Sequence, residues 1–194
     1  MSKPSSRAPG ARPGEVRLIG GRFKRSRLPV PDAPGLRPTP DRVRETLFNW
    51  LGQDLAGWRV LDAFAGSGAL GFEAASRGAS AVTLLEHDAR LVAGLSAVRQ
   101  RLGADAVSVL RADALAWMAR APRGGFDLVL LDPPFGAGLA APALAASAPL
   151  LGERGFVYLE TEAAESAVPQ PEGLEPVREL NAGAVRARLF RRAG

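Results

Sequence analysis

From residue 59 onward, short β-rich runs alternate with alanine-rich helical stretches, and this alternation constrains the fold more than any other feature. The β-rich runs are Arg59–Phe64, Ala81–Glu86, Ala106–Arg111, Phe126–Leu131 and Gly155–Glu160, and the helical stretches cover about 68–77, 88–103, 113–120 and 138–151. Strands that alternate with helices pair in parallel through right-handed crossovers. We therefore expect a doubly wound α/β sheet whose ligands lie at the carboxyl ends of its strands.

Both ends of the chain add antiparallel hairpins to this plan. Pro176–Asn181 and Ala184–Phe190 flank Ala182-Gly183 and predict a closing hairpin, which brings the expected Rossmann-like sheet to seven mostly parallel strands. Near the N-terminus, Val16–Ile19 and Arg22–Val30 flank Gly20-Gly21, a two-residue hairpin signal. An isolated hairpin is marginally stable, so this N-terminal arm must pack on the main domain or on a partner.

Residues 37–51 predict a helix between the arm and the sheet. Thr39 can cap this helix, Pro40 suits its first position, and Arg42 and Arg44 are expected to face solvent. We divide the chain into a disordered basic tail (1–14), a basic β-hairpin arm (15–36) and the main domain (37–194).

Charge is distributed unevenly along this chain of 194 residues, whose net charge is +5. Residues 1–50 hold eleven Lys or Arg and four Asp or Glu, whereas the rest of the chain holds fourteen and sixteen. The basic N-terminal quarter indicates a polyanionic partner such as nucleic acid, although a tail that only aids solubility would have a similar composition.

Composition also limits the compartment and the metal chemistry. The chain has no Cys and a single histidine, His87, so it offers neither a disulfide framework nor a Cys or His metal cluster. Its basic N-terminus is not followed by an apolar signal segment, and its longest apolar stretch, 137–151, is too short to span a bilayer. We expect a cytoplasmic monomer with no metal and no membrane partner.

The loop after the first sheet strand, Gly66-Ser-Gly-Ala-Leu-Gly71, matches the dinucleotide pattern G-x-G-x-x-G. Asp62 precedes it, and a carboxylate there would repel a pyrophosphate at the helix N-terminus. A positively charged ligand fits better, and S-adenosylmethionine carries an ammonium and a sulfonium but no phosphate. The first two glycines then let the backbone approach the nucleoside, whereas Gly71 is expected to serve only the packing of the helix on the sheet.

Two further acids follow the second and third strands. Glu86 ends the second strand, where a carboxylate can accept the protons of both ribose hydroxyls. Asp113 follows the third strand and can either bind the adenine amino group or cap the next helix. The two roles of Asp113 can coexist.

The fourth strand leads into Asp132-Pro133-Pro134-Phe135. The prolines remove two N–H donors, which leaves the Asp132 carboxylate and the Pro133 carbonyl as acceptors beside an aromatic plate. This arrangement fits a planar base with an exocyclic amine, held by two acceptors and stacked on Phe135. The amine can then attack a methyl sulfonium through positioning and electrostatics alone.

Several segments resemble those of known methyltransferases. "LDAFAGSGALGFEA" and "LDPPF" resemble amino-methyltransferase motifs, and "VRLIGGRFKRSRLPVP", "LRPTPDRVRETLFNWL" and "AGAVRARLFRR" are similar to segments of the bacterial RsmD family. The resemblance covers about residues 15–192 and implies a class I methyltransferase domain that uses S-adenosylmethionine. It also implies transfer to the N2 amine of one guanine in 16S rRNA, conventionally guanine 966, within a small-subunit assembly particle.

The resemblance also implies roles for individual residues. The cofactor-binding set is Asp62, Phe64, Gly66, Gly68, Glu86, Asp113 and Thr39. The catalytic set is Asp132, Pro133, Pro134 and Phe135. The RNA-binding set is Arg22, Lys24, Arg25, Arg27, Arg37 and Arg42. The family usually shows a second Thr where this chain has Pro40, and Tyr or Phe after the two prolines.

Four other functions stay open. An N6-adenine methyltransferase acting on DNA or RNA would use the same D-P-P-F chemistry, although a DNA enzyme of this type usually carries a separate target-recognition domain. Methylation of a protein glutamine is opposed only by the basic arm. A nicotinamide-dependent oxidoreductase would need a catalytic Lys, Tyr, Ser or His that is not convincingly placed here. A non-catalytic RNA-binding module conflicts with the complete set of acids, Asp62, Glu86, Asp113 and Asp132.

Overall fold

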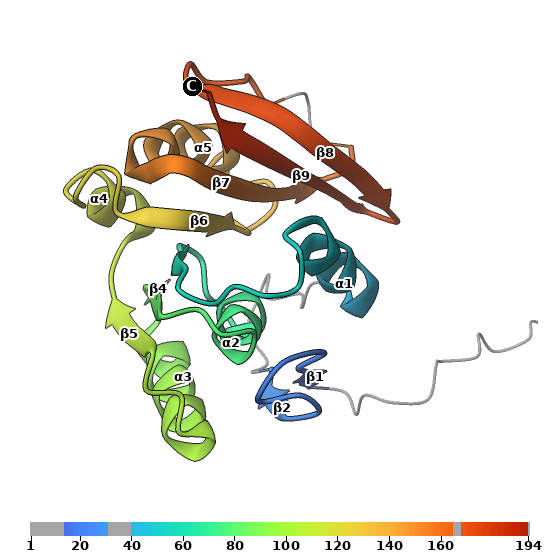
Figure 1. The fold of residues 1–194 in the computed structure, drawn as a ribbon, viewed down its shortest axis with the longest axis vertical. Coiled ribbons are helices and arrows are strands. Elements are labelled where there is room, and N and C mark those ends of the chain that lie inside the picture. The colour runs from blue at the N-terminus through green and yellow to red at the C-terminus, as the bar shows by residue number, and fades with distance from the viewer. Residues whose placement is uncertain (1–13, 31–39, 165–167, 194) are drawn as a thin grey trace, which may run out of the picture.

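A seven-stranded sheet forms the centre of the molecule (Figure 1), in a computed structural model that describes residues 14–30, 40–164 and 168–193. The strand order is β5-β4-β3-β6-β7-β9-β8. The strands are β3 (Arg59–Asp62), β4 (Ala81–Glu86), β5 (Val107–Arg111), β6 (Phe126–Leu131), β7 (Leu151–Glu162), β8 (Leu174–Ala182) and β9 (Val185–Arg192). β3 to β7 run parallel to one another, and β9 is antiparallel to both β7 and β8. The predicted α/β class and seven mostly parallel strands are confirmed.

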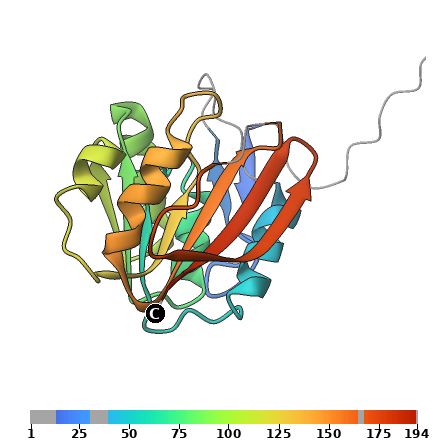
Figure 2. The same cartoon turned by 90° about the horizontal axis from the view of Figure 1, so that it is seen from above.

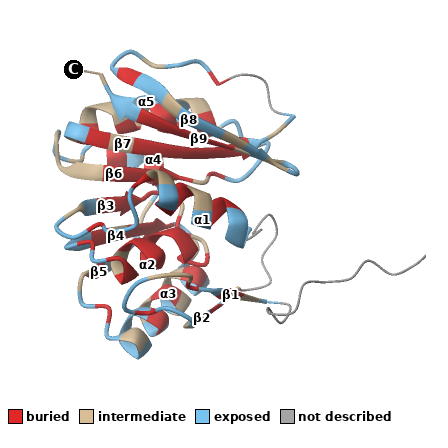
Figure 3. Cartoon of the chain, turned by 45° about the vertical axis from the view of Figure 1, so that its right-hand side comes forward, coloured by how far each residue is buried: buried red, intermediate tan, exposed pale blue. Residues whose placement is uncertain are grey.

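Helices cover both faces of this sheet. They are α1 (Asp41–Trp50), α2 (Ala69–Ser76), α3 (Ala89–Leu102), α4 (Ala114–Met118) and α5 (Ala140–Ser147), the last followed by the 3₁₀ turn η1 (Ala148–Leu150). α1, α2 and α3 bury apolar side chains in one core, and α4 and α5 bury theirs in a second core on the opposite face. Figure 2 shows α1 and α5 on opposite sides of the sheet, and Figure 3 shows that its central strands are buried. In the described ranges, no helix has the length and apolarity needed to cross a bilayer.

Several element boundaries differ from the predicted ones. α4 is a short helix of five residues. α5 ends at Ser147, two residues before Pro149, which has no N–H to continue an α-helix. The prediction that Pro40 occupies the first helical position is wrong, because its extended ψ of 142° makes it the N-cap and Asp41 the first helical residue. The predicted cap, Thr39, lies outside the described residues.

The N-terminal arm is a hairpin, but its turn is not the predicted one. β1 (Glu15–Arg17) and β2 (Arg27–Pro29) pair antiparallel over three residues each, and residues 18–26 connect them. The prediction of a two-residue turn at Gly20-Gly21 is therefore wrong. These glycines lie against the end of α2 instead, where a Cβ on Gly21 would overlap with the carbonyl of Ser76.

The arm packs on the main domain, which was one of the two expected outcomes. Val16, Leu18, Phe23 and Leu28 are buried in the same core as α1 and α2. The predicted basic tail lies outside the described residues, apart from Gly14.

Arg44 of α1 is completely buried, so the expectation that it faces solvent is wrong. Its Nη2 donates to the Arg17 carbonyl at 2.8 Å and to the Asp41 carboxylate at 2.7 Å. Its Nη1 lies 3.9 Å from the Glu73 carboxylate of α2. Arg44 thus joins the arm, α1 and α2, whereas Arg42 is exposed as expected.

Candidate active site

Three of the predicted acids meet where the sheet changes direction. From β3 the chain proceeds outward through β4 and β5, then returns to place β6 on the other side of β3. In doubly wound sheets, ligands bind in the crevice at the carboxyl ends of the strands at such a point. Asp62 ends β3, Glu86 ends β4 and Asp132 directly follows β6.

The glycine loop between β3 and α2 uses its amides to hold carboxylates. The Gly66 amide donates to Glu86 Oε2 at 3.1 Å, and the Gly71 amide donates to Asp62 Oδ2 at 3.0 Å. The Gly68 amide donates to the Ala65 carbonyl at 2.6 Å. Because these donors are already engaged, the loop is poorly suited to a pyrophosphate. Phe64, which the resemblance assigned to the cofactor, is half-buried at the start of this loop.

Gly71 has a second role that sequence reasoning missed. A Cβ at this position would overlap with the side chain of Leu84 on β4, as expected for a packing glycine. Its amide also fixes the Asp62 carboxylate. The available signal was an acid at a strand end followed nine residues later by a glycine in the first turn of the next helix.

Asp62 is a buried carboxyl whose hydrogen bonding is incomplete, with only 1% of its surface exposed. Burial is the main cause that raises the pKa of Asp62 from 3.8 to about 7. The charges of Asp132 and Glu86 act in the same direction, and the amides of Gly71 and Phe64 oppose them. Within the described part of the chain, its Oδ1 has no hydrogen-bond partner. A buried carboxylate oxygen without a partner is costly, so this position fits a ligand with a positively charged donor.

Glu86 is held rigidly at the end of β4. Its Oε1 accepts from the amides of His87 at 2.8 Å and Asp88 at 2.9 Å, in addition to the Gly66 bond on Oε2. The side chain is 7% exposed. Its orientation is therefore fixed before any ligand binds.

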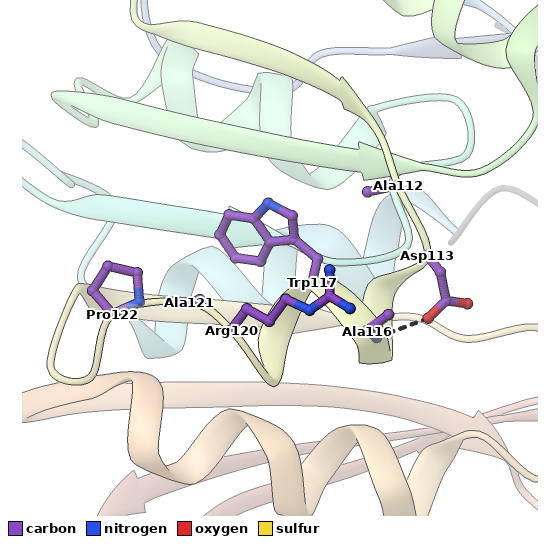
Figure 4. Close-up of a pocket in the computed structure, with 7 residues that line it drawn as sticks. All are labelled: Ala112, Asp113, Ala116, Trp117, Arg120, Ala121 and Pro122. Carbon is purple, nitrogen blue, oxygen red and sulfur yellow. Dashed lines mark hydrogen bonds between the residues drawn. The ribbon is translucent and has the colours of Figure 1, made fainter.

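Asp113 caps α4, which confirms one of its two expected roles. Its Oδ1 accepts from the Ala116 amide at 2.8 Å. Asp113 also lines a shallow pocket of about 400 Å³ that extends past Trp117 to Arg120 and Pro122 (Figure 4). The adenine role of Asp113 stays a prediction.

The loop after β6 presents an aromatic ring to solvent. Asp132 is half-buried and Pro133 is buried, whereas Pro134 and Phe135 are exposed. Among the described residues, Phe135 and Leu110 are the two large apolar side chains classed as exposed. Phe135 is 36% exposed and follows the Asp132 carboxylate and the Pro133 carbonyl, so its ring is suited to stack on a planar ligand.

Two ionisable residues of β7 lie beside this loop and were missed from the sequence. β6 and β7 pair Leu131 with Leu159, so Asp132 and Glu160 occupy neighbouring positions. The Tyr158 hydroxyl donates to Glu160 Oε1 at 2.8 Å. Burial is the main cause that raises the pKa of Tyr158 well above its ordinary value. The neighbouring carboxylates of Glu160 and Asp132 raise it further. The available signal was a pair of ionisable residues two positions apart in the otherwise apolar run 156–160.

The structure does not bring the basic arm into this crevice. Arg22, Lys24 and Arg25 are exposed in the loop that contacts the carboxyl end of α2, and α2 leads back to the amino edge of the sheet. Arg27 is paired with Glu15 at 3.0 Å. Arg37, which belonged to the same predicted set, lies outside the described residues.

The sheet order and this crevice define a class I methyltransferase. The sequence profile of the family "Conserved hypothetical protein 95" matches residues 16–191. Two proteins named "Ribosomal RNA small subunit methyltransferase D" are each 40% identical to the chain: that of Escherichia coli, with 92% of this chain and 91% of the relative covered, and that of Haemophilus influenzae, with 91% and 94% covered. The solved structure of a putative methyltransferase from Escherichia coli superimposes with a TM-score of 0.82 at 37% identity, covering 92% of this chain and 98% of that one. The chain belongs to this family, known as the RsmD family.

Proposed function

We propose that the protein transfers a methyl group from S-adenosylmethionine to the N2 amine of a guanine in 16S rRNA, of the guanine 966 type. Family membership supports the ribosomal RNA substrate. The observation that carries the chemistry is the position of Asp132 beside the buried, incompletely bonded Asp62, with the exposed Phe135 three residues further along the loop.

The donor set of the crevice fits S-adenosylmethionine. Asp62 would accept from the ammonium of the methionine part, because its Oδ1 is buried and lacks a partner in the described chain. Glu86 would accept from the ribose hydroxyls and Asp113 from the adenine amino group. The loop of Phe64, Gly66 and Gly68 would support the nucleoside, with Thr39 as a further contact. When bound, the cofactor supplies an electrophilic methyl group on a sulfonium.

The residues after β6 would hold the target guanine. The Asp132 carboxylate and the Pro133 carbonyl accept from the two N–H groups of the amine, Pro134 keeps the backbone rigid, and Phe135 stacks on the ring. With both protons engaged, the nitrogen lone pair would be more available for attack on the methyl carbon. The nitrogen–carbon bond would form as the carbon–sulfur bond of the sulfonium breaks, which leaves a neutral thioether, and the nitrogen would pass one proton to the Asp132 carboxylate or to water. Catalysis then rests on positioning and electrostatic stabilisation.

The same proposal assigns the remaining parts of the chain. The arm, residues 15–36, and the exposed Arg42 contact RNA phosphates, and residues 37–194 form the methyltransferase domain. The substrate is 16S rRNA within a small-subunit assembly particle, and the enzyme acts as a monomer in the cytoplasm.

Transfer of labelled methyl groups to small-subunit particles from cells lacking this protein tests the proposal. Digestion of the RNA to nucleosides should place the label on N2-methylguanosine. The Asp132→Ala variant should lose transfer while calorimetry shows cofactor binding close to wild type, because Asp132 contacts the base. Label on adenine or on protein would contradict the guanine assignment, and loss of cofactor binding in the variant would contradict the role of Asp132.

A further inference from the structure

The loop of the arm is bonded to the last turn of α2 through its backbone. Glu73 accepts from the amides of Ile19 and Gly20, both at 2.8 Å. The Arg22 amide donates to the Ser76 carbonyl at 2.7 Å, and the Phe23 amide donates to the Ser76 hydroxyl at 2.8 Å. The end of a helix leaves carbonyls without partners, and here the arm supplies a donor for one of them.

A buried ionic cluster fixes this contact from beneath. Glu73 is completely buried. Its Oε1 accepts a hydrogen bond from Arg77 Nε at 2.8 Å and forms an ion pair with Arg77 Nη2 at 2.8 Å. Arg77 in turn lies over the ring of Phe48 on α1, at 4.7 Å from the centroid. A Cβ on Gly20 would meet the Arg77 guanidinium at 2.5 Å and would displace it from this cluster, and a Cβ on Gly21 would overlap with the backbone carbonyl of Ser76.

A third element joins the arm from the other side. Arg101, at the carboxyl end of α3, donates from Nη2 to the Arg27 carbonyl at 2.6 Å. Arg101, Arg22, Lys24 and Arg25 are all exposed. α2 and α3 both run from the carboxyl edge of the sheet back to its amino edge, so these cations gather at the edge opposite Asp132.

We propose that the arm loop and the end of α3 form one rigid phosphate-binding surface at the amino edge of the sheet, positioned by the seating of Gly20-Gly21 on Glu73 and Ser76. The partner is the sugar-phosphate backbone of the RNA substrate, so the inference rests on the proposed function for the identity of that partner. Cations on a fixed surface contact phosphates without reading sequence.

The surface and the catalytic loop lie at opposite ends of the strands. The six residues of β6 span about 20 Å at the usual rise per residue. RNA that fills the crevice and also contacts the arm must therefore extend around the α2 and α3 face of the protein. The arm would then contribute to affinity at a distance from the methylated base and leave the choice of base to the crevice.

The Gly21→Ala variant tests whether the seating of the loop matters. Gly21 has φ +70 and no room for a Cβ, whereas the control Gly173→Ala has φ +82 with nothing within 4 Å, so both introduce similar backbone strain and one adds the clash. We expect Gly21→Ala to bind 16S rRNA at least about tenfold more weakly, with affinity for S-adenosylmethionine unchanged by calorimetry, and Gly173→Ala to match wild type. Equal RNA affinity of the two variants would overturn the proposal.

A second variant keeps the test decisive if Gly21→Ala does not fold. The double substitution Lys24→Ala with Arg101→Ala removes two exposed cations, one from each part of the surface. The slope of log affinity against log salt should become shallower by about 1.4 to 1.8, and an unchanged slope would overturn the proposal. Both readouts are binding measurements, so label on the wrong base would contradict the proposed function without deciding this inference.

Discussion

Asp62 combines burial with a position that needs a negative charge. Its pKa of about 7 means that the free protein holds this carboxyl largely protonated at slightly acidic pH. The ionised form, which a cationic ligand requires, is costly because the side chain is removed from water. Binding of the cofactor should therefore be coupled to loss of a proton from Asp62.

We expect the affinity for S-adenosylmethionine to fall by up to about tenfold for each pH unit below about 7, because the carboxyl must first lose its proton. Calorimetry between about pH 5.5 and pH 8.5 measures this dependence. In Asp62→Asn the affinity should be weak and nearly independent of pH. Equal wild-type affinity at both ends of the range would contradict the assignment.

The stability of the free protein should change in the opposite direction. A carboxyl whose folded pKa is raised stabilises the fold below its unfolded value, 3.8, and that contribution is lost as the pH rises through about 7. Without cofactor at about pH 8, Asp62→Asn should therefore melt at a higher temperature than wild type.

The acids at the strand ends could be predicted because each follows a recognisable apolar run. The buried pair Tyr158 and Glu160 could not be predicted to lie at the site. The alternation of residues along a strand shows which side chains share a face of the sheet, but it does not show which residues of other elements pack against that face. Arg44 was missed for a related reason: its partners lie in the arm and in α2, and helical spacing on α1 does not reveal them.

At the level of elements, helix α2 positions both the Asp62 carboxylate of the crevice and the N-terminal arm. Its first turn holds Asp62 through Gly71, and its last turn holds the arm through Glu73 and Ser76. The helix was predicted well from its alanine-rich pattern. Its contact with the arm was not predicted, because the dipeptide Gly20-Gly21 fits a tight hairpin turn as well as it fits a close contact with a helix.

Two helical glycines make a matched test of this packing. Gly71→Ala on α2 would place a methyl group against Leu84 and should lower the free energy of unfolding by about 1–3 kcal/mol. It should also weaken cofactor binding by displacing Asp62. Gly94→Ala on α3 has open space around the new Cβ and should raise stability by about 0.5–1 kcal/mol. Denaturant melts of both variants measure the difference, and destabilisation of similar size in both would contradict the packing role of Gly71.

For the whole molecule, the arm is part of the folded core and not an appendage. Removing residues 1–30 would delete Val16, Leu18, Phe23 and Leu28 from the core and should cost more than about 5 kcal/mol of stability. Thermal melting should show a large loss for this truncation and little change for a chain that starts at residue 14, because the sequence predicts a disordered tail there. Similar melting of the full chain and of the chain lacking residues 1–30 would show that the arm does not stabilise the domain.

The overall fold was predictable because alternating strands and helices leave few possible topologies. The position of the arm at the edge of the sheet opposite the crevice was not predictable, because the net charge of a segment does not show at which edge of the sheet that segment lies. That position depends on hydrogen bonds from amides of the arm to side chains of α2 that are more than fifty positions away in the sequence.

The hydrogen bonds between the backbone of the arm and the last turn of α2 have an evolutionary consequence. A change at Glu73 or Ser76 removes acceptors that the arm uses, and a side chain at Gly20 or Gly21 has no room unless α2 also changes. These four positions should therefore vary together among relatives and be inherited as a unit. An arm transplanted from a distant relative would need to bring its own version of the last turn of α2 with it.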